Sequence, residues 1–278
     1  MTRTTAPDHD RRTGADATGP LRIGTAGWTV PKVHQAVFPT DGSHLERYAA
    51  RFSAVEINSS FYRPHRPSTY ERWAASVPDG FRFAVKMPKA VTHERRLEHA
   101  GELAARFLDE VSALGDRLGP LLVQLPPSLA FTSGLAIRFL SDLRRSFAGP
   151  VVCEPRHASW FTPEVDRLLV DLKIARVAAH PAPAAGADAP GGWRGLAYWR
   201  MHGSPKMYYS AYSADALDRL AAKLQAEAAA GCEVWCILDN TAAFAATGDA
   251  LNLIQTLACG GGGADGEIRR HPGLEDQP

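Results

Sequence analysis

Residues 151–160, VVCEPRHASW, contain the abrupt change of character that decides the fold of this chain. The apolar run 151–153 is followed directly by Glu154, Arg156 and His157. Strands of α/β barrels end in this way, because such barrels present their chemistry at the carboxyl ends of the strands. Taken alone, the stretch fits equally well a salt-bridged loop after a buried strand. The choice depends on whether other strands of the chain end in the same way.

Short apolar runs recur along the chain and alternate with amphipathic stretches. The expected strands are residues 21–25, 54–58, 82–86, 121–125, 150–154, 174–178, 197–202 and 233–239. Most of these runs lack a clean alternation, which is typical of parallel strands that are covered on both faces. The expected helices are residues 44–52, 68–76, 101–118, 135–147, 163–172, 214–230 and 249–257.

This alternation predicts an α/β protein with a TIM-barrel-like (β/α)8 fold. One crossover breaks the pattern, since residues 180–195, HPAPAAGADAPGGWRG, are too rich in Pro and Gly to favour a helix. We therefore expect a barrel that is distorted, or lacks a helix, between its sixth and seventh strands. An open, doubly wound sheet is the alternative, but the chain contains neither a GxGxxG fingerprint nor a P-loop.

Composition sets the expected domain organisation and class. Residues 1–20 and 260–278 are polar and rich in small residues, so we expect disordered tails around one domain, residues 21–259. The 31 basic and 30 acidic residues nearly cancel, which argues against nucleic acid and anionic membranes as partners. The chain shows no apolar run of the ~20 residues that cross a bilayer, and no secretory signal. We expect a cytoplasmic protein; the sequence leaves its oligomeric state open.

Polar residues concentrate at the carboxyl ends of the expected strands. Three pairs, each two positions apart, are Glu56 with Asn58, Glu154 with Arg156, and Arg200 with His202. Each pair shares one face of its strand, because side chains alternate along an extended chain. If these faces point into the barrel mouth, carboxylates, guanidinium groups and an imidazole meet in one cavity. The pattern predicts a functional site there.

The predicted catalytic residues are Glu56, Glu154 and His202, which can transfer protons or act as nucleophiles if burial shifts their pKa values. The predicted substrate-binding residues are Asn58, Tyr62, Lys86, Gln124, Arg156, Trp160, Arg200 and Asn240. The basic groups among them suit an anion, and the aromatic rings suit the wall of a pocket. Each also has a structural interpretation: a buried ion pair, a satisfied core histidine, or simple packing.

Several phrases of the chain, in order over about residues 21–258, resemble the YecE-like family, the domain of unknown function 72 (DUF72). They include IGTAGW (23–28), FSAVEINSSFYR (52–63), LLVQLPPSL (121–129), CEPRHASWF (153–161), YWRMHGSPKMYYSAYS (198–213) and LDNTAAFAATGDAL (238–251). The resemblance implies a TIM-barrel-like fold and implies no activity. The chain departs from the family pattern at Asp239, where an asparagine is common, and near His180, where an aspartate is expected.

The leading hypothesis is an enzyme that binds a polar or anionic small molecule at the carboxyl-terminal mouth and acts by acid/base chemistry. Hydrolysis, isomerisation and lyase chemistry all fit. A glycosidase version requires the carboxyl groups of Glu56 and Glu154 to lie about 5–9.5 Å apart across a glycosidic bond.

Two alternatives remain open at this point. A metal-assisted enzyme would use the oxygen and imidazole ligands of Glu56, Glu154, His202 and Asp239. A non-catalytic protein would bind a ligand, or nucleic acid through rim arginines: Arg63, Arg66, Arg95 and Arg96. The sequence identifies no cofactor and does not decide whether the chain is an enzyme.

Overall fold

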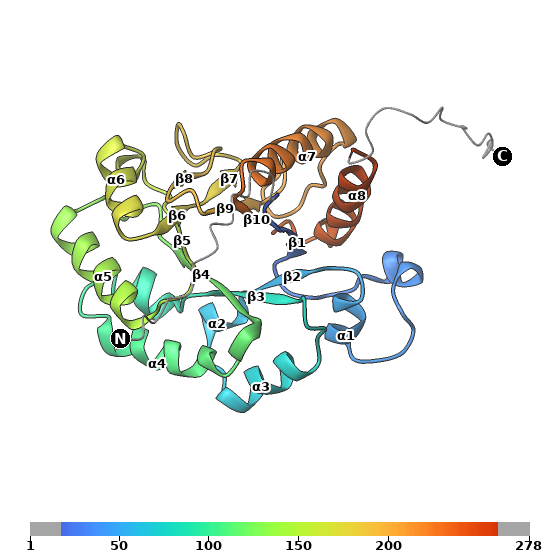
Figure 1. Cartoon of the computed structure of the whole chain (residues 1–278), viewed down its shortest axis with the longest axis horizontal. Helices are drawn as coiled ribbons and strands as arrows, with labels where there is room; N and C mark the ends of the chain where they lie inside the picture. Colours follow the sequence, from blue (N-terminus) through green and yellow to red (C-terminus); the bar gives the residue numbers. More distant parts are fainter. Residues whose placement is uncertain (1–17, 261–278) are drawn as a thin grey trace, which may run out of the picture.

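The computed structural model describes residues 18–260, in which helices surround a central group of strands (Figure 1). One sheet has the order β1 (Leu21–Thr25), β10 (Glu233–Leu238), β9 (Leu196–Met201) and β7 (Ala178–His180). The other has the order β2 (Ala54–Ile57), β3 (Arg82–Lys86), β4 (Leu118–Gln124), β5 (Val151–Glu154), β6 (Ile174–Arg176) and β8 (Gly191–Gly192). Every pairing is parallel except the short β6–β8 pair. The predicted TIM-barrel-like α/β fold is confirmed.

The helices follow the strands as the sequence predicts. They are α1 (His44–Ala49), α2 (Ser59–Tyr62), α3 (Pro67–Ala75), α4 (Gly101–Ser112), α5 (Ser133–Ser146), α6 (Pro163–Asp171), α7 (Ala214–Ala229) and α8 (Ala245–Gly260). Hydroxyl caps start three of them: Ser43 at α1, Thr162 at α6 and Ser213 at α7 each accept a bond from a backbone N–H of the first turn. The four-residue helix α2 was not expected. It places Phe61 and Tyr62 directly after β2.

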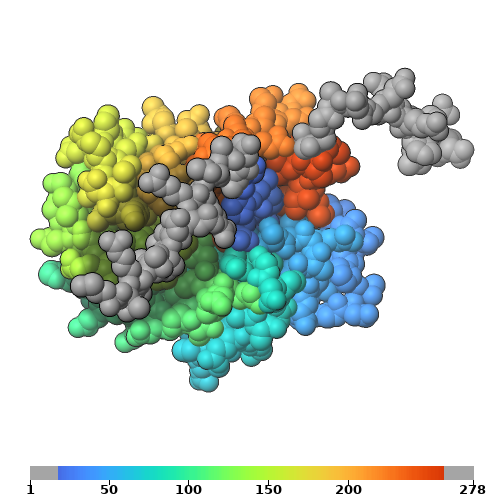
Figure 2. Space-filling view, viewed as in Figure 1, coloured from blue at the N-terminus to red at the C-terminus, as the bar shows by residue number. Residues whose placement is uncertain are grey.

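The first seam of the barrel lies between β1 and β2, which join through a single bridge, Ala26 to Glu56. The Tyr48 hydroxyl of α1 spans this seam, accepting from the Thr25 N–H at 2.8 Å and donating to the Ala54 carbonyl at 3.0 Å. A Cβ on Gly24 would lie 2.1 Å from that carbonyl oxygen, so glycine is required for the close approach. In the space-filling view, the dark blue residues of β1 lie beside the red ones of α8 (Figure 2).

The second seam lies within the sixth strand, which the structure divides into β6 and β7. β6 pairs with β5, and β7 pairs with β9, so the chain passes from one sheet to the other at Val177. The crossover that follows, residues 181–195, contains no helix and adds only the short strand β8. This agrees with the distortion predicted from its Pro and Gly content.

Two apolar clusters support the strands. The larger one packs the outer faces of the strands against the helices. The smaller one lies on the strand faces that also carry the conspicuous charges: Ala54 shares a face with Glu56, Val152 with Glu154, and Tyr198 with Arg200. Along these faces, charged side chains therefore follow the apolar ones toward the carboxyl ends of the strands.

The expected tails lie almost wholly outside the described residues. Residues 1–17 and 261–278 are not described, so the prediction of disorder there is not tested. Gly260 belongs to α8 rather than to the expected carboxyl-terminal tail. Within residues 18–260, none of the helices is both long enough and apolar enough to cross a membrane.

Replacing Tyr48 by phenylalanine tests the first seam. Tyr48→Phe leaves the Thr25 N–H and the Ala54 carbonyl without their partner in a fully buried place, so we expect it to lower the free energy of unfolding by ~1–3 kcal/mol. Tyr70→Phe is the matched control, because Tyr70 is equally buried and its hydroxyl has no partner. Urea denaturation measures both. Equal stability of the two variants would contradict this role of Tyr48.

Candidate functional site

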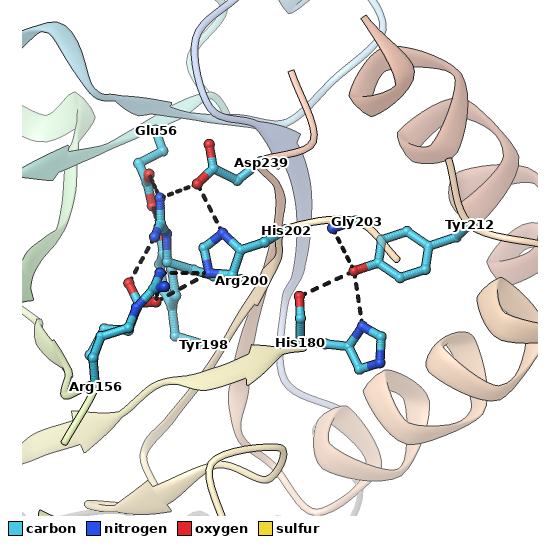
Figure 3. Close-up of polar contacts among 10 residues, drawn as sticks. Glu56, Arg156, His180, Tyr198, Arg200, His202, Gly203, Tyr212 and Asp239 are labelled. Atoms are coloured by element: carbon cyan, nitrogen blue, oxygen red, sulfur yellow. Dashed lines mark hydrogen bonds and ion pairs between the residues drawn. The ribbon is translucent and has the colours of Figure 1, made fainter. Parts of the chain in front are cut away.

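Five charged or titratable side chains meet at the carboxyl ends of four strands (Figure 3). Glu56 belongs to β2, Glu154 ends β5, and Arg200 belongs to β9. His202 follows β9, and Asp239 follows β10. All five are buried; Asp239 has the largest exposed fraction, 8%. We refer to these five residues as the polar layer.

Arg200 is the centre of the polar layer. Its Nε and Nη2 atoms donate to the two oxygens of Glu56 at 3.1 and 2.8 Å. Its Nη1 donates to Glu154 Oε2 at 2.7 Å, and Nη2 also donates to Asp239 Oδ2 at 2.9 Å. The guanidinium group thus binds three carboxylates from three strands, one of them in the bidentate geometry that suits arginine.

His202 connects the remaining members of the layer. Its Nδ1 lies 3.0 Å from Asp239 Oδ2, and its Nε2 lies 3.2 Å from Glu154 Oε1. Arg156, directly after β5, places Nη2 2.7 Å from Glu154 Oε1 and 3.0 Å from His202 Nε2. The imidazole therefore lies between two carboxylates, and the guanidinium group of Arg156 covers one of them.

These contacts determine the ionisation of the carboxyl groups. Burial raises the pKa of Glu154, but the guanidinium groups of Arg200 and Arg156 outweigh burial and hold that pKa well below its usual range. Burial likewise opposes ionisation of Asp239, and Arg200 with His202 lowers its pKa overall. Both groups are therefore carboxylates at neutral pH.

Lys86, half-buried at the end of β3, lies beside the polar layer. Burial, followed by the neighbouring charge of Arg200, lowers the pKa of its amine to about 8, although the carboxylates of the layer act in the opposite direction. Its Nζ lies 4.2 Å from the centroid of the Phe61 ring. Three carboxylates face the two guanidinium groups of Arg200 and Arg156, so a protonated Lys86 balances the remaining negative charge.

The other predicted binding residues divide into two groups. Gln124 ends β4 in register with Glu154 and is buried, and Asn58 follows β2 with its Oδ1 buried and without a partner. Asn240 is fully buried after β10, donating from Nδ2 to Ser210 and to Asp249. These three lie at the strand ends, as predicted.

Tyr62 and Trp160 are not brought to the polar layer by any contact in the structure. Tyr62 is 78% exposed on α2. Trp160 is buried, donates its indole N–H to the Leu129 carbonyl at 2.9 Å and packs edge-on against Phe131. These contacts agree with the packing interpretation of Trp160.

Tyr198 belongs to the site, although sequence reasoning did not select it. Its hydroxyl donates to Glu56 Oε2 at 2.8 Å, so every oxygen of Glu56 is bound. The signal was present in the sequence, because Tyr198 precedes Arg200 by two positions and shares its face. It was missed because a tyrosine inside an apolar strand is ordinary core material.

A loop after β9 covers His202. The Tyr208 ring lies edge-on to the imidazole, with centroids 5.5 Å apart, and the loop returns to the barrel at Tyr212. Gly203 starts the loop with φ +90°, and a Cβ there would lie 2.7 Å from the Ser210 carbonyl oxygen. Glycine is therefore required for the turn that brings Tyr208 over His202.

The geometry weighs against the glycosidase version of the leading hypothesis and against the metal-assisted alternative. A guanidinium group binds Glu56 and Glu154 together, so it occupies the place that a glycosidic bond would need between them. Within residues 18–260, no group of three or more His, Cys, Asp or Glu residues is arranged to hold a metal ion. Arg200 and Arg156 already supply the positive charge that a metal ion would bring to these carboxylates.

The chain belongs to the DUF72 family, described as "Protein of unknown function DUF72", whose model matches residues 22–271. YecE of Escherichia coli K12 is 33% identical over 143 residues, which are 51% of this chain and 50% of YecE. YunF of Bacillus subtilis is 26% identical over 153 residues, 51% of this chain and 53% of YunF. These matches thus span about half the length of each curated relative. The family resemblance predicted from the sequence is confirmed.

Solved structures share the fold. A DUF72 protein of Enterococcus faecalis superposes with a TM-score of 0.73 at 19% identity, covering 92% of this chain and all of that one. A DUF72 protein of Thermotoga maritima gives 0.70 at 24%, covering 86% and 99%. The 3-keto-D-glucoside 4-epimerase YcjR of Escherichia coli gives 0.51 at 16%, covering 86% and 100%. At these identities the likeness shows the fold alone.

Titration of Lys86 tests the electrostatics of the site. We expect its side-chain amine to lose its proton near pH 8, because burial and Arg200 disfavour the ammonium form. In Glu154→Gln the midpoint should fall further, because a carboxylate that favours the ammonium form is removed. Side-chain NMR of labelled lysine measures both, with Lys86→Met to assign the resonance. A midpoint above pH 10, or one that rises in Glu154→Gln, would contradict this electrostatic picture.

Proposed function

We propose that the chain is an enzyme that binds a small anionic molecule at the carboxyl-terminal mouth of the barrel and transfers protons to or from it. The observation that carries this proposal is the place of Lys86, half-buried at a strand end beside a fully ion-paired polar layer, where burial lowers the pKa of its amine to about 8. An amine of this pKa exchanges its proton readily at neutral pH, which is what a general acid or base needs.

Each charged residue at the barrel mouth has a distinct role in this proposed reaction. Arg156 and Lys86 together bind an anionic group of the substrate. Arg156 has a buried Nε that lacks a hydrogen-bond partner. His202 is the second proton carrier, because an imidazole bound at both ring nitrogens can accept a proton at one and release it from the other, as a carboxylate such as Glu56 cannot. Glu56 supports these groups through Arg200, because both of its oxygens are already bound. The sequence-based prediction gave Glu56 a catalytic part; the geometry favours a positioning part.

This arrangement serves several reaction classes. Isomerisation, elimination and hydrolysis all need an anion-binding group beside a proton donor or acceptor. The buried unpaired oxygens of Asn58 and Asn240 suit hydroxyl groups of a polar substrate. A non-catalytic binder of the same anion is the second candidate, because Lys86 and Arg156 bind an anion whether or not a proton moves.

Exposure of the protein to a mixture of small carboxylates, sugar acids and phosphate esters in deuterated water tests the proposal. Proton NMR follows both new products and the exchange of carbon-bound hydrogen, which reports proton transfer without net reaction. We expect turnover by the wild-type protein, and a fall of about 10²–10⁴-fold in His202→Asn and in Lys86→Met. Lys89→Met is the matched control, because Lys89 lies on the surface beside Glu94.

Turnover in the control should equal that of the wild type. If compounds of the mixture perturb the Lys86 resonance but are neither converted nor exchanged, the protein is a binder rather than an enzyme. Equal turnover by Lys86→Met and wild type would remove Lys86 from the mechanism.

A further inference from the structure

A cavity lies on the flank of the barrel, next to the crossover that has no helix in residues 181–195. Its volume is about 170 Å³, and it opens between the outer faces of β7 and β9 and the helix α7. It is lined by His180, Trp199, Met201, Tyr212, Leu220 and Lys223, among others. Trp199 alternates with Arg200 along β9, so the cavity and the polar layer lie on opposite faces of one strand.

The indole of Trp199 has an unsatisfied donor. The residue is only 5% exposed, and its Nε1–H has no acceptor. Two other buried indoles are satisfied: Trp160 donates to the Leu129 carbonyl, and Trp235 donates to Glu233 at 2.9 Å. Buried polar groups without partners are rare in folded proteins and call for an explanation. A ligand that supplies a hydrogen-bond acceptor to the Trp199 indole is such an explanation.

The charges around the cavity favour an anion. Lys223 has its Nζ 5.7 Å from the centroid of the Trp199 ring, and Arg219 lies one turn earlier on α7. Asp188 is the one acidic residue of the lining, so the two cations leave one net positive charge. Met201, Leu220 and Ala216 make the rest of the wall apolar.

We propose that this flank cavity is a second binding site, for a small monocarboxylate with a short apolar chain. The carboxylate accepts from the Trp199 indole and faces Lys223, while the chain contacts Met201 and Leu220. The size agrees, since a cavity of about 150 Å³ holds a benzene molecule, so about six non-hydrogen atoms fit here.

Tyr212 connects a ligand in the flank cavity to the barrel mouth. The Tyr212 hydroxyl accepts from the Gly203 N–H at 2.9 Å and lies 3.0 Å from His180 Nδ1 (Figure 3). Gly203 follows His202 in the chain and starts the loop that carries Tyr208. Tyr212 also lines the cavity, so a bound ligand contacts its ring and shifts the hydroxyl that holds the Gly203 amide next to His202. The ligand is therefore an effector of the mouth rather than its substrate.

Titration of the full chain with butyrate, a monocarboxylate of this size, tests the proposal. Nitrogen–proton NMR resolves the indole N–H signals of the six tryptophans, and Trp199→Phe assigns the one of interest. We expect this signal to shift saturably with butyrate but not with butyramide, which has the same size and no charge. The Gly203 amide signal should shift with the same midpoint.

Variants separate binding from coupling. Lys223→Met should weaken butyrate binding by about tenfold or more, because a charged partner is lost. Lys32→Met, an exposed lysine on another element, should bind as the wild type does. Tyr212→Phe should keep the Trp199 response and lose the Gly203 response.

An unmoved Trp199 signal, an equal response to butyramide, or unchanged affinity in Lys223→Met would overturn the site. A Gly203 signal that stays still while the Trp199 signal saturates would overturn the coupling. These readouts do not depend on turnover at the mouth, so the failure of the proposed enzyme activity would leave them unaffected.

Discussion

The arrangement of charged residues at the mouth of this barrel depends on the ion pairs of the Arg200 guanidinium group. It binds carboxylates from β2, β5 and the end of β10, so it joins both sheets across the interior of the barrel. Isolating three carboxylates from water would cost several kcal/mol for each ion. Arg200 offsets that cost for all three at once, and its position decides where His202 and Arg156 can lie.

This constraint explains why the deep part of the polar layer has no free polar atoms, and why our proposal places the chemistry at Lys86 and Arg156. Glu56 has both oxygens bound, by Arg200 and Tyr198, and no atom of it is left for a substrate. At the outer edge, Lys86 and Arg156 keep partly free donors. The charge of the layer is nearly balanced, and Lys86 supplies the last positive charge, which our proposal assigns to binding an anion.

Much of this arrangement was predictable from the sequence. Apolar runs that end in Glu154, Arg156, Arg200 and His202 located the strand ends, and the Pro- and Gly-rich residues 180–195 located the irregular crossover. The pairing among these groups was not predictable, since a strand pattern says which face a side chain takes and not which partner it meets. Trp160 shows the limit, because an aromatic residue beside a charged motif has the same pattern whether it lines a pocket or fills the core.

Acid titration of Arg200→Met tests the central role of Arg200 most directly. In the wild type, the lowered pKa values of Glu154 and Asp239 mean that these groups stabilise the fold above pH 4 and lose that contribution as pH falls. Without Arg200, burial raises the carboxyl pKa values instead, so the folded state binds protons more readily than the unfolded state. We expect a loss of ~3–5 kcal/mol in the free energy of unfolding at pH 7, partly recovered between pH 7 and 5. A variant as stable as the wild type, or one that loses stability on acidification in parallel with it, would contradict this account.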